Sequence, residues 1–259
     1  MDRLFRFLLT SVICLLSSMS TAQIVNVETS VNLAGEQRML VQRVAKLYSQ
    51  IGLNVLPSIA VSQLALASNR FESNLKALGP VVAESTEATL AMARLLEAWQ
   101  GMKNALTAPV SREAAEALSR QAEVSLAAAE NLTRVIETQQ KSETTQLINQ
   151  AGRQRMLSQR IANNYLLRSW GVESAAVREN LEMSSNELSA GLAKLIARPH
   201  NSVEIQRELE EVSQQWDWLK ASLSVEGASS YRLIVAESAD AMLEATDRVT
   251  RLYAEQARR

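Results

Sequence analysis

The chain of 259 residues has very little of several residue types, and each shortage excludes a class of protein. It holds one cysteine, which argues against a disulfide framework or a thiolate metal site, and one histidine, which leaves few groups for general-base catalysis. Only four prolines and eight glycines interrupt it. The net charge of −1 gives no reason to expect nucleic acid as a partner. We therefore expect a helical protein that is not an enzyme and uses no cofactor or metal.

The first 22 residues have the pattern of a secretory signal peptide. Arg3 and Arg6 precede a short apolar run, and small residues lead up to Ala22. The alternative is an uncleaved anchor, but the run is shorter than the roughly 20 residues that span a membrane. The sequence predicts cleavage after Ala22, which would also remove Cys14. Since no later stretch approaches 18 apolar residues, we expect a soluble periplasmic protein whose mature chain does not insert into a membrane.

The most informative feature is an internal repeat. Residues 31–48 return as residues 148–165 at an offset of 117, and eleven of the eighteen aligned positions are identical. A period of this length suits a small domain rather than a solenoid unit. The sequence therefore predicts a tandem duplication, with one domain at residues 23–140 and the other at residues 141–259.

Apolar residues spaced by three and four, with abundant Ala, Leu and Glu, predict an all-α fold. The expected helices are residues 24–54, 58–78, 81–107, 111–140, 142–170, 173–197, 202–224 and 228–257. Each domain would be an antiparallel four-helix bundle, with Ser58, Ser111 and Ser202 as N-caps and a break at Gly79-Pro80. The polar segment 137–146 contains neither glycine nor proline, so a long continuous helix joining the bundles is as consistent with the sequence as a turn.

The core of each bundle can also be read from the sequence. The fourth expected helix carries a stripe of Leu118, Ala122, Leu126, Ala129 and Leu132. Trp99 and Trp216 occupy equivalent positions of the repeat, and we expect each to anchor its own core rather than bind a ligand.

The repeated segment also carries polar residues that a core does not need. On a helix, Gly35, Arg38 and Gln42 share one face, with Asn32 one turn earlier. The second copy has Gly152, Arg155, Gln159 and Asn149 at the same positions. A glycine inside a helix costs about 1 kcal/mol relative to alanine, which suggests close approach of another helix or of a ligand to the backbone.

Two readings of the arginines follow. If the repeats pack about a pseudo-twofold axis, Arg38 and Arg155 approach and repel each other, and a small planar oxyanion between them would remove the repulsion and accept their forked donors. Alternatively, they pair with acids such as Glu36 or acids on adjoining helices, which residue chemistry alone favours because most arginines on helices are structural or solvated. Arg43 and Arg160 point away from the first pair and are candidates for salt bridges.

Residues 32–43 and 148–162 resemble the signature of a periplasmic sensor domain shared by type IV pilus chemotransducers of the PilJ type and nitrate sensor kinases of the NarX type. In the nitrate sensors this stretch corresponds to the so-called P-box, whose arginine contributes to a nitrate site between two subunits. The resemblance implies that role for Arg38 and Arg155, with Gly35 and Gly152 beside the anion. Two repeats of one chain would then replace two subunits.

The resemblance implies a sensor that binds a small oxyanion such as nitrate or nitrite. Families of this kind continue into a membrane helix and a signalling module, for which this chain has no room, so we expect a membrane-bound sensor kinase, chemoreceptor or other envelope partner to receive the signal. The copies differ at Glu36 against Arg153, and Glu36 would oppose an anion. The alternative is a ligand-free accessory or scaffold protein of the envelope, associated with a sensor or a type IV pilus system.

Overall fold

The computed structural model describes residues 27–139, 142–225 and 229–256, which form eight α-helices and no strand. The helices are α1 (Val27–Gly52), α2 (Pro57–Val82), α3 (Thr86–Leu106), α4 (Arg112–Gln139), α5 (Glu143–Ser169), α6 (Ala175–Ile196), α7 (Val203–Leu223) and α8 (Ser229–Gln256). The predicted all-α fold with two four-helix bundles is confirmed. The predicted signal peptide and Cys14 lie outside the described residues. None of the helices that the structure describes combines the length and the apolarity that crossing a membrane requires.

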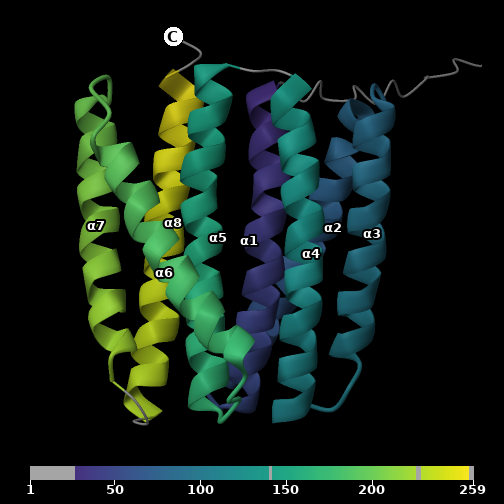
Figure 1. Ribbon diagram of the computed structural model, residues 1–259, viewed down its shortest axis with the longest axis vertical. Helices are drawn as coiled ribbons and strands as arrows, with labels where there is room; N and C mark the ends of the chain where they lie inside the picture. The colour runs from purple at the N-terminus through teal and green to yellow at the C-terminus, as the bar shows by residue number, and fades with distance from the viewer. Residues whose placement is uncertain (1–26, 140–141, 226–228, 257–259) are drawn as a thin grey trace, which may run out of the picture.

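The two repeats lie side by side, with α1 and α5 next to each other in the middle of the molecule (Figure 1). Within the repeats, α1 packs on α2 and α4, and α5 packs on α6 and α8 in the same way. Helices α1 and α5 run in the same direction, because Arg38 bonds to Asn149 while Ser49, three turns further along, bonds to Asn163. The first helices of the two repeats therefore form a long, shared contact.

The polar segment between the repeats is not a continuous helix. Helix α4 ends at Gln139 and α5 begins at Glu143, and Figure 1 shows them as two separate helices with α1 between them in this view. Ser142 caps α5 in a capping box, because its hydroxyl accepts a hydrogen bond from the Thr145 amide while the Thr145 hydroxyl accepts one from the Ser142 amide. These side-chain bonds start a new helix without help from glycine or proline.

Two of the three predicted N-caps are confirmed. The hydroxyl of Ser202 accepts a bond from the Ile205 amide at the start of α7, and Ser111 does the same immediately before α4. Ser58 is not a cap, because α2 begins one residue earlier at Pro57, whose fixed φ suits the first position of a helix.

The predicted break at Gly79-Pro80 is wrong, because α2 continues through both residues to Val82. A proline ring normally clashes with the Cβ of the residue before it when that residue is helical. Gly79 has no Cβ, so the proline fits into the last turn of the helix. Helix α3 consequently begins at Thr86 and not near residue 81, and Ser85 is its N-cap.

The cores of the two repeats are built alike. Trp99 and Trp216 are 2% and 4% exposed, which confirms them as core residues. Trp99 stacks on Phe71 with 4.0 Å between ring centroids, and its indole N–H donates to Glu72. Trp216 donates to Ser189, which is the counterpart of Glu72 at the offset of 117. The predicted stripe of leucines and alanines on α4 is also buried.

Candidate functional site

The contact between α1 and α5 brings the two repeated arginines into one site. The side chains of Arg38 and Arg155 are 0% and 2% exposed. Each reaches into the other repeat, because Arg38 Nη2 donates to Asn149 Oδ1 at 2.6 Å and Arg155 Nη2 donates to Asn32 Oδ1 at 2.7 Å. These two hydrogen bonds are reciprocal, so one polar site is made from two equivalent halves.

The charge of each arginine is met by a carboxylate on the last helix of its own repeat. Arg38 Nη1 lies 2.8 Å from Glu130 Oε2, and Arg155 Nη1 lies 2.7 Å from Asp247 Oδ1. These two acids are themselves 117 residues apart. Their side chains are 42% and 37% exposed, so each pair joins a buried cation to an acid that is in contact with solvent.

The charged groups of the site shift one another's pKa values. Burial lowers the pKa of Arg38, Glu130 offsets this only in part, and the nearby charges of Arg153 and Arg155 lower this pKa further. Burial on its own would raise the pKa of Glu130, but the charges of Arg38 and Arg153 hold it below its usual value. The arginines of both repeats therefore repel one another, and Glu130 partly offsets this repulsion.

Each repeated glycine makes room for the arginine that follows it. An ideal Cβ placed on Gly35 would lie 3.0 Å from Arg38 Nη2, and one on Gly152 would lie 3.0 Å from Arg155 Nη2. Arg38 Nε also donates to the Gly35 carbonyl at 3.3 Å. The neighbour that approaches the backbone is thus the guanidinium group one turn further on, whereas the sequence suggests another helix or a ligand.

The two predicted glutamines do not join the arginines. Gln42 Nε2 donates to Glu123 Oε1 at 3.0 Å, and Gln159 Nε2 donates to the Ala239 carbonyl at 2.9 Å. The Oε1 atoms of both glutamines are buried and have no hydrogen-bond partner in the described part of the chain. They belong to a second polar layer, one turn further along α1 and α5.

That second layer consists of ion pairs between the repeats. Arg43 lies 2.7 Å from Asp240, and Arg160 lies 2.5 Å from Glu123, so the predicted salt bridges of these arginines are confirmed. Lys46, with a fully buried side chain, lies 2.6 Å from the same Asp240. Burial lowers the pKa of Lys46 to about 8, although Asp240 acts in the opposite direction.

Glu36 in the first repeat and Arg153 in the second are equivalent positions with opposite charges, and the residue that pairs with each is reversed in charge as well. Glu36 lies 3.2 Å from Arg70 on α2, whereas its counterpart Arg153 pairs with Glu187 on α6. The two pairs occupy equivalent positions with opposite polarity. Glu36 is therefore turned to α2 and does not neutralise Arg38, while Arg153 also bonds to Glu130 at 2.6 Å.

Sequence reasoning missed Glu130 and Asp247, the acids closest to the two arginines. The available signal was their shared offset of 117, which also relates Glu123 to Asp240. Among the described residues, no group of three or more His, Cys, Asp or Glu side chains is placed to hold a metal ion.

The fold and the site together define a duplicated, all-helical bundle with a polar interior at its approximate twofold axis. Comparison with protein families identifies the particular family, because the family model for the N-terminal domain of type IV pili methyl-accepting chemotaxis transducers (PilJ) matches residues 19–126 and 136–250. The chain belongs to this family, and the two adjacent matches confirm two tandem copies. Comparisons with curated proteins and with solved structures gave no match.

Membership of this family suggests a sensor domain with signalling partners. Domains of this family are typically extracytoplasmic, and the family is not catalytic.

Proposed function

We propose that this chain is a periplasmic sensor protein that binds a small planar oxyanion, such as nitrate or nitrite, and whose ligand state is read by a membrane-bound partner. The observation that supports this function best is the pair of buried guanidinium groups at the contact of α1 and α5. Arginine suits a planar oxyanion because its forked N–H groups match two oxygens of the anion. Asn32 and Asn149 hold the two guanidinium groups in place.

Binding of the anion would be an exchange of counter-charges. Glu130 and Asp247 occupy the Nη1 atoms of the arginines, but both carboxylates are partly exposed. A carboxylate near the surface regains hydration when it turns away, so releasing it costs less than releasing a buried one. The incoming anion would then lie between Arg38 and Arg155 and relieve their repulsion.

The exchange suggests how ligand state reaches the surface. A ligand shifts a conformational equilibrium only through its different affinities for the two states. Here the states differ in whether α4 and α8 are bonded to the arginines through Glu130 and Asp247. Anion binding would weaken the attachment of α4 and α8, and a sensor kinase or chemoreceptor that contacts either helix could detect the change.

A second function, a ligand-free accessory or scaffold protein of the cell envelope, is favoured by one specific observation. Both arginines already have internal carboxylate partners and are shielded from solvent. In that case the polar site holds the repeats together, and the outer surface of the bundle binds the partner.

Thermal unfolding in the presence of anions separates the two functions. We expect nitrate or nitrite, but not chloride, sulfate or phosphate at matched ionic strength, to raise the unfolding temperature. Ligand at about 100 times its dissociation constant contributes roughly 2.7 kcal/mol, which is several degrees for a protein of this size. No shift with any of these anions, in protein shown to be folded, would favour the scaffold.

Three variants locate the effect. Arg38→Lys and Arg155→Lys keep the positive charge but lose the forked pair of N–H donors, so each should abolish the rise in unfolding temperature. Arg43→Lys, on the same helix as Arg38 but paired with Asp240, is the matched control and should keep it.

Removing the competing carboxylate tests the exchange itself. Glu130→Gln eliminates the charge that the anion must displace, so the affinity for the anion should rise about tenfold, the equivalent of one charged hydrogen bond at its weak end. Titration calorimetry measures this directly, and weaker binding by the variant would contradict the exchange.

A further inference from the structure

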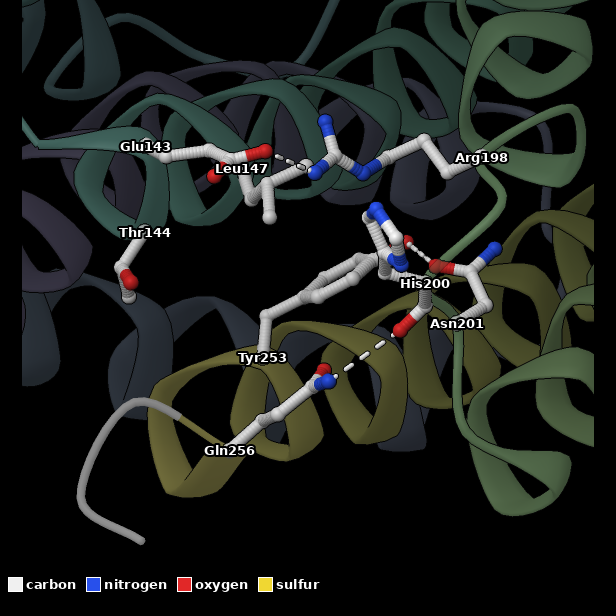
Figure 2. A pocket seen from close by; sticks show the side chains of 8 residues that line it. All are labelled: Glu143, Thr144, Leu147, Arg198, His200, Asn201, Tyr253 and Gln256. Atoms are coloured by element: carbon white, nitrogen blue, oxygen red, sulfur yellow. Dashed lines mark hydrogen bonds and ion pairs between the residues drawn. The ribbon is translucent and has the colours of Figure 1, made fainter.

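A polar cavity lies in the second repeat, away from the contact of α1 and α5. It has a volume of about 260 Å³ and lies where α5 begins, α8 ends and the loop between α6 and α7 passes. Figure 2 shows Glu143 and Thr144 of α5, Arg198 and His200 of the loop and Tyr253 of α8 around this space. Three separate elements thus supply polar groups to one cavity.

The first repeat does not have these polar groups. The counterparts of Arg198, His200 and Tyr253 at the offset of 117 are Val81, Ala83 and Ile136. The first repeat therefore forms its four-helix bundle without these polar groups, although Val81 lies inside α2 while Arg198 lies in the loop after α6.

The loop that carries the cationic side chain is held by a buried network. The Tyr253 hydroxyl donates to Asn201 Oδ1 at 2.8 Å, and Asn201 Nδ2 donates to the Leu195 carbonyl at 2.8 Å. Gln256 Nε2 donates to the His200 carbonyl at 3.2 Å. Burial raises the pKa of Tyr253 to about 12, so its hydroxyl remains a donor at physiological pH. Since Tyr253 and Asn201 are both buried, the loop is fixed before any ligand arrives.

Several donors around the cavity are available to a ligand. Arg198 pairs with Glu143, whose side chain is 73% exposed and is therefore a replaceable partner. The imidazole of His200 and the hydroxyl of Thr144 have no hydrogen-bond partner among the residues that the structure describes. Thr144 lies in the first turn of α5, where the helix dipole adds positive potential. The cavity therefore offers donors to an anionic group.

We propose that this cavity binds a small solute that carries a carboxylate group. The solute's carboxylate replaces Glu143 at the guanidinium group of Arg198 and accepts further hydrogen bonds from Thr144 and His200. Its hydrocarbon part lies against the ring of Tyr253 and the side chain of Leu147, which also line the cavity (Figure 2). The volume is near the lower end of small-molecule sites, which suits a short carboxylic acid or an amino acid rather than a larger ligand.

His200 is the only histidine of the chain, so its imidazole gives one assigned NMR signal for the cavity. The full chain is titrated with sodium acetate or glycine, and with sodium chloride and sodium sulfate at matched ionic strength. We expect acetate and glycine to shift the His200 signal to saturation. A response to glycine alone also supports the proposal and identifies amino acids as the source of the carboxylate. A response to sulfate equal to that to acetate, or no saturable response to acetate or glycine, overturns it.

The decisive variant gives the second repeat the residue of the first. Arg198→Val copies Val81 and removes the guanidinium group from a loop that Tyr253 and Asn201 continue to hold, so binding should weaken about tenfold or more because a charged hydrogen bond is lost. Arg94→Val removes the same charge from an exposed site on α3 and should leave binding unchanged. Unaltered binding by Arg198→Val overturns the proposal. Arg38→Lys should also bind normally, which separates this cavity from the oxyanion site.

Discussion

Replacing Gly35 by alanine tests whether the glycine exists to accommodate the arginine of the site. In an ordinary helix this change stabilises the protein, by about 1 kcal/mol. Here the added methyl group would lie 3.0 Å from Arg38 Nη2, closer than side chains normally approach. The guanidinium group must then move by a few tenths of an ångström, although its Nη2 is held at 2.6 Å by Asn149 Oδ1.

The two effects can be weighed against each other. A hydrogen bond that involves a charged group contributes about 1.5–3 kcal/mol. The guanidinium group is held by Asn149 and by Glu130, and the loss of one of these bonds would exceed the gain in helix propensity. On this basis we expect Gly35→Ala to destabilise the protein by about 0.5–2 kcal/mol. The same reasoning applies to Gly152→Ala, because the distances at the second copy are nearly the same.

Urea unfolding of a double-mutant cycle measures the coupling. In an Arg38→Met background no guanidinium group remains above the glycine, so Gly35→Ala should now stabilise the protein by about 1 kcal/mol. The sign of the effect thus reverses between the two backgrounds. If Gly35→Ala stabilises the protein that retains Arg38, the guanidinium group is not held against this glycine and the reasoning is refuted.

Three further changes have expected outcomes. The pKa of Lys46 falls from 10.5 to about 8 on folding, so between these pH values the unfolded chain holds a proton that the folded chain has lost. Stability should consequently rise with pH across this window, by about 3 kcal/mol relative to Lys46→Met, in denaturant titrations at each pH; an equal slope in both proteins would contradict this. Trp99→Ala removes the ring stacked on Phe71 and should cost about 3–5 kcal/mol in urea unfolding, whereas a cost near zero would place the ring outside the core. Ser142→Ala removes the N-cap of α5 and should cost about 1 kcal/mol in the same assay, with no loss expected if α4 and α5 were one helix.

The fold could be predicted because its main signal is repeated. Residues 31–48 and 148–165 share both their apolar spacing and their polar residues, so two copies of one helical unit followed directly. The helix ends were harder to predict, since local rules depend on combinations of residues. Pro57 starts α2 before Ser58 can cap it, and the absence of a Cβ on Gly79 lets the helix continue through a proline.

Several residues of the site could be predicted from the sequence, but their hydrogen-bond and ion-pair partners could not. The sequence places Asn32 and Arg38 on nearby turns of one helix, but it does not show that each asparagine binds the arginine of the other repeat. This pairing between the repeats depends on how α1 and α5 are aligned, which is a property of tertiary packing. The carboxylate of Glu130 was missed for the same reason, because α4 lies far from α1 in the sequence.

The contact between α1 and α5 has a consequence for how such a protein can signal. Two separate subunits must overcome the loss of translational and rotational freedom each time they associate, an estimated 4–15 kcal/mol. In this chain the connection between α4 and α5 covalently tethers the two halves, so dilution cannot separate them. The contact that forms the Arg38–Arg155 site is therefore independent of protein concentration. Under the proposed function the signal would be a rearrangement within one molecule. The two halves are also free to differ, as the charge-swapped pairs at Glu36 and Arg153 already do.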